Sequence, residues 1–240
     1  MVFHIGSLTS FATIIPILLY GSEIWGLEGT ETLQVMFNKV MRIFLRLHKT
    51  TSKCMINGEL GLKEISEYIE NRMLNFWHNL ATGDENKISS ILYKWIKIQY
   101  DQSMYPHVDQ AIAQQAHQSN NGNNGLLWLK KVKATLDRID MSDTFNNIAD
   151  INKIWFKNNI KVKLADVYCQ KWSNSVFYNS VCTNYRAMTK VKKLQNYIIQ
   201  LPKQYIYPFL KFKCANHYMP IVSGRYSNTP IVKEYANCAN

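Results

Sequence analysis

The chain has 240 residues, 47% of them hydrophobic, which is enough for one large hydrophobic core or two small ones. Only 10 Gly and 6 Pro, together with 12% aromatic residues, exclude collagen-like, mucin-like and wholly disordered chains. The 28 Lys+Arg against 17 Asp+Glu give a net charge of +11, which favours polyanionic partners such as nucleic acids over neutral or acidic ones.

The N-terminal segment is not expected to cross a membrane or to direct export. Its longest apolar run, residues 11–20, contains Pro16 and is about half the ~20 residues that a membrane-spanning helix needs. A secretory signal would place basic residues before this run, and residues 1–10 offer only His4. We therefore expect an intracellular protein, in the nucleus or the cytoplasm, that is not secreted.

The first strong helical pattern lies between Leu33 and Leu47, where apolar side chains recur at three- and four-residue spacings. It predicts an amphipathic helix with Thr30 at its N-cap. Basic residues form a neighbouring stripe at similar spacings: Lys39, Arg42, Arg46 and Lys49. This stripe has two interpretations, a solvated helix face or a face that follows the phosphates of a primer-template duplex.

Two further helices are predicted by apolar spacing over residues 62–80 and 88–98. We interpret the apolar stripes of both helices as core. Residues 51–62, between the first two predicted helices, are short and contain glycine, so a tight helix-turn-helix arrangement is expected.

A polar segment, residues 105–124, follows these helices. It has few large apolar groups and no charge after Asp109, which is typical of a linker. Before residue 120 the chain has 10 Lys+Arg against 11 Asp+Glu, and after it 18 against 6. We therefore predict an all-α fold of two loosely joined helical subdomains, residues 1–104 and 125–240, with the excess positive charge in the second.

The second half begins with a predicted helix over residues 126–136, followed by a long helix from a cap at Asp150 to about Val176. The apolar seam of the long helix is predicted at Ile151, Trp155, Val162, Ala165, Cys169, Trp172 and Val176. On another face of this helix, basic residues recur one turn apart: Lys153, Lys157 and Lys161. Like charges at this spacing repel each other, so the row favours either plain solvation or neutralisation by a polyanion.

Beyond residue 182, basic residues alternate with aromatic ones. The basic candidates for binding are Lys190, Lys192, Lys193, Lys211, Lys213 and Arg225. Cations that hold phosphates and rings that stack on bases are what single-stranded nucleic acid requires. Phe209 and Phe212, however, are interpreted as core residues of a helix around residues 205–217.

Catalytic motifs are missing from the sequence. There is no glycine-rich phosphate loop, no His-Glu-x-x-His and no Gly-x-Ser-x-Gly, and the acidic residues of the second half show no paired carboxylates for two metal ions. The five cysteines lack a Cys-x-x-Cys pair, which favours free thiols over disulfides or zinc. We therefore expect no catalytic residue, no metal and no cofactor.

Five segments resemble non-LTR retrotransposon reverse transcriptases. Residues 15–26 (IPILLYGSEIWG) are similar to the segment Pro-x-Leu-x-Tyr-Gly-x-Glu-x-Trp of the helical thumb region of that family. Residues 46–49, 57–61 and 72–77 continue in the same order, and residues 216–225 match the pattern Asn-His-x-x-Pro-Ile-x-x-Gly-Arg. The resemblance spans nearly the whole chain and implies the thumb and post-thumb connector of such an enzyme.

Two departures from the family pattern bear on function. The metal-binding aspartates of the family belong to a palm upstream of Pro16, and only 15 residues precede Pro16 here, so the resemblance implies that the palm and fingers core is absent. After Arg225 the family has a Cys-x-x-Cys with further ligands, whereas this chain has only Cys238. Because a structural zinc site needs four ligands, the zinc-binding segment is expected to be truncated.

The resemblance and the charge together predict a catalytically incomplete fragment with electrostatic, sequence-tolerant nucleic-acid binding. Its expected partners are RNA or DNA, and the missing polymerase core if the two are expressed together. Two alternatives remain: an inert translated remnant, or a helical module whose apolar faces around Trp25 and Trp95 bind a protein. A contiguous exposed apolar patch at these tryptophans would favour the interaction module.

Overall fold

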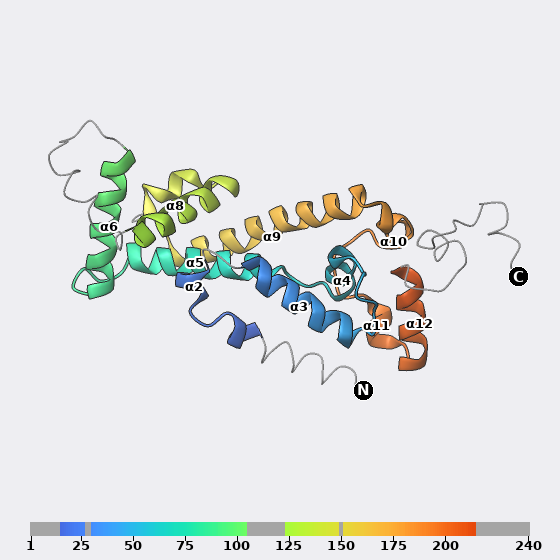
Figure 1. Ribbon diagram of the computed structural model, residues 1–240. Coiled ribbons are helices and arrows are strands. Elements are labelled where there is room, and N and C mark those ends of the chain that lie inside the picture. Colours follow the sequence, from blue (N-terminus) through green and yellow to red (C-terminus); the bar gives the residue numbers. More distant parts are fainter. Residues whose placement is uncertain (1–14, 27–29, 105–122, 149–150, 215–240) are drawn as a thin grey trace, which may run out of the picture. The chain divides into compact units, whose positions relative to one another are not determined.

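The computed structural model of the chain describes residues 15–26, 30–104, 123–148 and 151–214 (Figure 1). Helices make up 77% of this part, which contains no strand or sheet, so the all-α prediction is confirmed. None of the helices in these ranges has the length and apolar character needed to cross a membrane. In chain order the elements are α2 (Ser22–Trp25), α3 (Thr30–Phe44), α4 (Lys53–Leu60), α5 (Ile65–Ala81), α6 (Ile88–Met104), α8 (Asn123–Arg138), the 3-10 helix η1 (Ser142–Phe145), α9 (Lys153–Tyr178), the 3-10 helix η3 (Ser180–Cys182), α10 (Thr183–Met188), α11 (Asn196–Gln200) and α12 (Lys203–Lys213).

The contacts between residues divide the chain into two compact units. Unit 1 contains the described parts of residues 32–64 and 169–214, and unit 2 those of residues 15–31 and 65–168. Both units combine segments from either side of the predicted linker, so they do not follow the predicted division into 1–104 and 125–240. Residues 105–122 of that linker lie outside the described residues, and its last two residues already belong to α8.

The core of unit 2 explains why the chain does not divide at the predicted linker. Trp77 of α5 is fully buried, donates a hydrogen bond from Nε1 to the Tyr93 hydroxyl of α6 at 3.0 Å, and stacks on Phe145 of η1 with ring centroids 5.7 Å apart. Leu129 and Leu136 of α8 belong to the same buried cluster. Helices from both sides of the linker therefore share one hydrophobic core.

Helix α6 has the predicted position but the opposite buried face. The predicted core stripe is exposed, with 52–76% of each side chain accessible: Ile88, Ile91, Leu92, Trp95 and Ile98. The buried face instead carries Tyr93 and Tyr100. The physical reason is that these two rings have partners in the core, since Tyr93 accepts the Trp77 hydrogen bond and Tyr100 packs edge-on against Phe145.

The predicted apolar seam of α9 is also wrong, chiefly in the first half of the helix and again at Cys169, which is exposed. Phe156, Ile160 and Leu164 are buried there, whereas Trp155 and Val162 are exposed. The predicted cap, Asp150, lies outside the described residues. The capping is performed by the side chain of Asn152, whose Oδ1 accepts hydrogen bonds from the backbone N–H groups of Ile154 and Trp155 at 2.8 and 3.2 Å.

In unit 1, the segment predicted as a glycine-containing turn is helix α4. Its residues Cys54 to Glu59 are all buried. A short helix buried on several sides has no amphipathic period, which is why spacing did not reveal it. Gly58 is necessary there, because a Cβ at this position would lie 2.3 Å from the Tyr185 hydroxyl and 2.7 Å from the Trp172 ring.

The prediction that Phe209 and Phe212 of α12 are core residues is wrong. Each is 41% exposed, whereas Ile206, Leu210 and Cys214 are buried. The buried residues recur at four-residue spacing and so define one face of the helix. The two phenylalanines lie beside that face and are partly accessible to solvent.

Candidate nucleic-acid interface

The basic row of α9 is exposed as predicted. Lys153, Lys157 and Lys161 follow one another at four-residue steps, so their Cα atoms lie on a line about 12 Å long. Lys157 and Lys161 each follow a buried residue by one position. One position rotates a side chain by about 100° around the helix axis, so the row lies outside the core of unit 2. Helix α9 carries five lysines against the single acid Asp166, so its exposed surface is strongly positive.

No carboxylate among the described residues forms an ion pair with the three lysines of the row. The neighbouring Lys163 behaves differently, because its Nζ donates a hydrogen bond at 2.9 Å to the backbone oxygen of Asp140. Lys171, further along the helix, pairs with Glu64 at 3.0 Å. Repulsion within the row costs a few tenths of a kcal/mol per pair, and a polyanion would relieve it.

The predicted basic stripe of α3 is not continuous. The helix ends at Phe44, and Arg46 takes the left-handed conformation, with φ 53°, of a Schellman cap: its N–H donates to Ile43 O, and that of Leu47 to Arg42 O. Arg46 and Lys49 therefore lie beyond the helix.

Two residues of that stripe also make intramolecular contacts. Arg42 donates from Nε and Nη2 to the backbone oxygen of Thr51 at 3.0 and 2.8 Å, and burial lowers its pKa. The Arg46 guanidinium lies 4.5 Å from the ring centroid of Tyr207. Lys39 and Lys49 are exposed and remain accessible to a phosphate.

The lysines between α10 and α11 lie on a segment that is fixed against the end of α4. Lys190 and Lys193 are exposed, and Lys192 is half-buried. The backbone N–H of Gln195 donates to Glu59 O at 3.0 Å. Gly61 has φ +63°, and a Cβ there would lie 2.5 Å from the backbone nitrogen of Leu194, so only glycine permits this close approach.

The structure places Lys211 and Lys213, two of the predicted basic residues of the C-terminal region, differently. Lys211 is exposed on α12, as the prediction requires. Lys213 corrects the prediction, because it is only 3% exposed and its ammonium group forms an ion pair with Glu59 at 2.7 Å. A buried, paired ammonium cannot contact a backbone phosphate. Arg225 lies outside the described residues.

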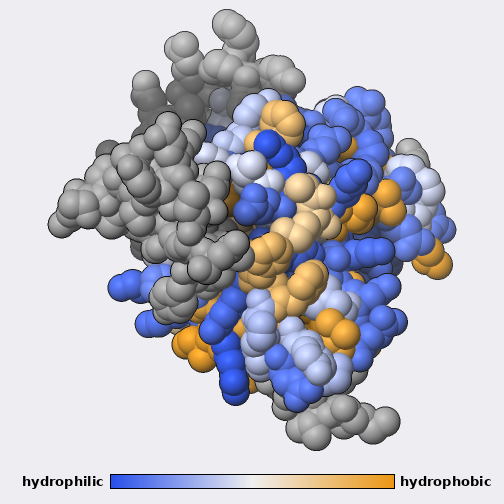
Figure 2. Space-filling view, turned by 90° about the vertical axis from the view of Figure 1, so that its right-hand side faces the viewer, coloured by the Kyte–Doolittle hydropathy of each residue, from blue (hydrophilic) through white to orange (hydrophobic). Residues whose placement is uncertain are grey.

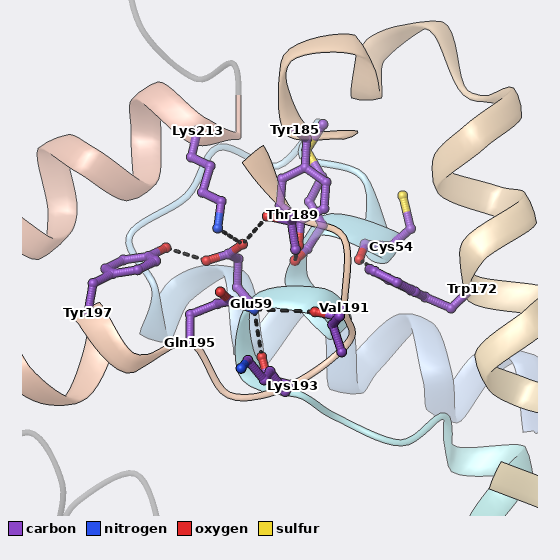
Figure 3. A network of polar contacts seen from close by, with 11 residues as sticks. Cys54, Glu59, Trp172, Tyr185, Thr189, Val191, Lys193, Gln195, Tyr197 and Lys213 are labelled. Carbon is purple, nitrogen blue, oxygen red and sulfur yellow. Dashed lines mark hydrogen bonds and ion pairs between the residues drawn. The ribbon is translucent and has the colours of Figure 1, made fainter. Parts of the chain in front are cut away.

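Glu59 is the centre of a buried polar network (Figure 3), and it is 0% exposed. Besides Lys213, its carboxylate accepts hydrogen bonds from the Thr189 hydroxyl at 3.3 Å and from the Tyr197 hydroxyl. The Lys213 ammonium also lies 5.5 and 5.2 Å from the ring centroids of Tyr185 and Tyr197. The network joins α4 to α10, α11 and α12.

This network keeps its tyrosines protonated. Burial, followed by the negative charge of Glu59, raises the pKa of Tyr185 and that of Tyr197. Both hydroxyls therefore remain hydrogen-bond donors, Tyr197 to Glu59 and Tyr185 to the backbone oxygen of Met55 at 3.3 Å. Because the carboxylate and the ammonium are enclosed together, the site can hold helices in place but offers no access to a substrate.

The exposed aromatic residues of unit 1 differ from those that the alternation suggested. Tyr185 and Tyr197 belong to the buried network, and Tyr207 lies under Arg46. Figure 2 looks onto the side of α10 and α12, where apolar side chains reach the surface among hydrophilic ones. Tyr205 and Phe212 of α12 are exposed, so bases could stack on their rings.

Unit 2 also presents an apolar surface, which we call the α6 face. It consists of the five exposed α6 residues named above, and Leu92 continues it into a groove of about 830 Å³ that Trp25 and Leu127 also line. Trp25 and Trp95 are both exposed. Leu92 links them, because it lies about one helical turn from Trp95 and lines the groove together with Trp25, and such an apolar surface favours a protein-interaction module.

No cluster of metal ligands accompanies these surfaces. Within the described ranges, no three His, Cys, Asp or Glu side chains are grouped so that they could hold a metal ion. His78, which is buried, lies with Nε2 3.4 Å from the backbone oxygen of Ile151, and burial lowers its pKa. It contributes to packing and hydrogen bonding in unit 2.

Comparisons of the chain with protein-family models, with curated proteins and with solved structures found no match in any of the three. The functional assignment therefore depends on the geometry of this chain and on its sequence motifs.

Proposed function

We propose that this chain binds nucleic acid as the thumb and connector region of a non-LTR retrotransposon reverse transcriptase. The observation that carries the proposal is the exposed row of Lys153, Lys157 and Lys161, which has no acidic partner among the described residues. Phosphate contacts of this kind position a strand without reading its bases, so binding is sequence-tolerant. In the family that the chain resembles, catalysis belongs to the polymerase core, and the proposal places this region beside such a core.

The motif segments support the same proposal. Residues 57–61 contribute Glu59 to the buried network, and the segment leading into the motif at residues 216–225 contributes Lys213. Two segments far apart in the sequence thus meet at one ion pair. We infer that they serve to fix the connector helices of unit 1, while the exposed lysine row of α9 contacts the nucleic acid.

Lysine footprinting tests which residues contact the strand. The full chain is acetylated briefly with and without a poly(U) oligonucleotide, and the modified positions are mapped by mass spectrometry. Acetylation of Lys153, Lys157 and Lys161 is expected to slow several-fold with the oligonucleotide, because bound phosphates cover their ammonium groups.

The same experiment contains its own control. Lys87 and Lys130 are exposed in unit 2 but lie outside the row, and we expect their acetylation to be unchanged. Equal protection of all exposed lysines would indicate non-specific electrostatic association of the oligonucleotide instead of an interface on α9. Protection of none would favour the inert-remnant interpretation.

The α6 face favours a second candidate function, protein binding. Five large apolar side chains exposed along one helix, beside an apolar groove, exceed what scattered surface residues of a soluble protein usually provide. The expected partner contributes an apolar helix face, since a groove beside a helix fits such a face. The polymerase core implied by the resemblance is one protein that could supply it.

Replacing Leu92 and Trp95 with Ser tests this second candidate. We expect the wild-type chain to bind an anilinonaphthalene sulfonate dye and to self-associate in sedimentation velocity runs as its concentration rises, and the double variant to lose both properties. Ile154→Ser is the control, because Ile154 is an exposed apolar residue on α9, outside the α6 face. A wild-type chain that stays monomeric and does not increase the fluorescence of the dye would exclude the α6 face as a protein-binding surface.

A further inference from the structure

Two buried cysteines of unit 1 lie side by side. The Sγ atoms of Cys54 and Cys182 are 3.3 Å apart, although 128 residues separate them in the chain. Both are free thiols, with 2% and 0% of their surface exposed. Among the described contacts, neither thiol group touches the Glu59 carboxylate or a residue of the basic surfaces. Their proximity therefore needs an explanation of its own.

The helices that carry the two thiols are held together by hydrogen bonds at their first turns. Ser52 precedes α4, and its hydroxyl accepts a hydrogen bond from Asn179 Nδ2 at 3.3 Å. The Oδ1 atom of the same Asn179 caps η3 by accepting from the Val181 N–H at 3.0 Å. In addition, Trp172 Nε1 donates to the backbone oxygen of Cys54 at 2.7 Å. The two cysteines are thus preorganised in their mutual orientation.

The two thiols are chemically unequal. Cys54 lies in the first turn of α4, where the helix dipole favours a thiolate, and its sulfur is 3.1 Å from the Ser52 hydroxyl. The hydrogen bond with Cys182 is the main cause that lowers the pKa of Cys54 to about 6, and it raises the pKa of Cys182. Cys54 is therefore the nucleophile, and Cys182 is the thiol that keeps its proton.

We propose that Cys54 and Cys182 are a redox pair that forms a disulfide when the chain meets a peroxide. The Cys54 thiolate attacks one peroxide oxygen, so that a sulfur–oxygen bond forms, the O–O bond breaks and hydroxide leaves. The Cys182 sulfur then displaces the oxygen from Cys54 and forms the S–S bond. The displaced oxygen leaves with the Cys182 proton as one water, and the proton that Cys54 released on ionising converts the hydroxide into a second water. The two sulfurs together lose two electrons, which reduce the peroxide.

The geometry favours the formation of the S–S bond and makes it selective. An S–S bond is ~2.05 Å long, so the two sulfurs need to approach by only about 1.3 Å, which small side-chain rotations supply. Cys214 is also buried in unit 1, but no hydrogen bond joins its sulfur to either thiol among the described contacts. Cys169 is exposed on α9 and serves as the control thiol.

Peptide mapping of the full chain tests the proposal, because trypsin places these cysteines on separate peptides. The protein is treated with hydrogen peroxide, free thiols are blocked with N-ethylmaleimide in denaturant, and the chain is digested without reduction. We expect residues 54–63 joined to residues 172–186, with a mass two hydrogen atoms below the sum of the two peptides. The melting temperature should rise on the order of 5–10 °C, because the bond closes a long loop.

Two single variants separate the roles of the thiols. Cys182→Ser should leave Cys54 as a sulfenic acid that dimedone traps on residues 54–63, whereas Cys169→Ser should form the linked peptides like the wild type. Oxidation of the exposed Met36 gauges the peroxide dose. Free Cys54 and Cys182 at a dose that oxidises Met36, or a link from Cys54 to Cys214 instead, would overturn the proposal.

Discussion

Replacing Glu59 with Gln is expected to lower the free energy of unfolding by about 3–5 kcal/mol, one of the largest effects of any single substitution in the chain. The substitution keeps the size of the side chain but removes its charge. It leaves the Lys213 ammonium, which is 3% exposed, without its anionic partner at 2.7 Å. Lys213→Met should cost a similar amount, because it removes the buried cation that pairs with the carboxylate and leaves neutral hydroxyls such as those of Thr189 and Tyr197 as its partners.

A double-mutant cycle separates the ion pair from packing. The double variant Glu59→Gln/Lys213→Met should lose clearly less stability than the sum of the two single variants, because no buried charge remains unpaired. Urea unfolding followed by circular dichroism measures each value. Glu85→Gln is the control, since Glu85 pairs with Lys94 at 2.6 Å on the surface and its loss should have little effect. Strict additivity of the two core variants would refute a coupled ion pair.

The helices of this fold were predictable from sequence where apolar spacing and burial agree. For α5 and α8, one apolar face meets one core, so the positions of the apolar residues indicate both the helix and its buried side. Helix α6 shows where this reasoning fails. It has two apolar faces, and the choice between them depends on Trp77 and Phe145, which lie on other elements.

Other features depend on contacts distant in sequence. Helix α4 is buried on several sides and therefore shows no period that spacing could reveal. Lys213 looks like any other lysine of a basic, aromatic segment until the structure places it beside Glu59. One signal was present, because Glu59 is the single acid of a stretch that is otherwise uncharged from Cys54 to Leu62. A lone charge in such a stretch indicates a buried partner.

The basic row of α9 was predictable because it depends only on local geometry. Residues four positions apart share a helix face whatever the core does, so an error in the predicted seam of α9 did not move the row into the core. The same reasoning gave a wrong prediction for the basic stripe of α3, because the helix ends at Phe44, before Arg46 and Lys49. Surface rows are thus predictable where the helix is long and its ends are known.

The salt dependence of nucleic-acid binding tests the central claim most directly. Fluorescence anisotropy of a labelled single-stranded oligonucleotide gives the affinity of the full chain at several salt concentrations. Each phosphate contact contributes roughly −0.7 to the slope of log affinity against log salt on a single strand. Changing Lys153, Lys157 and Lys161 together to Gln should therefore flatten the slope by about 2 units, for all sequences alike.

A charge-matched variant, in which Lys87, Lys94 and Lys130 are changed to Gln, lowers the net charge by the same amount at exposed positions outside the row. It should keep the wild-type slope, because general charge does not replace positioned contacts. The account predicts a flattened slope for the α9 variant alone. An unchanged slope in the α9 variant, or equal flattening in both variants, would contradict a nucleic-acid interface on α9.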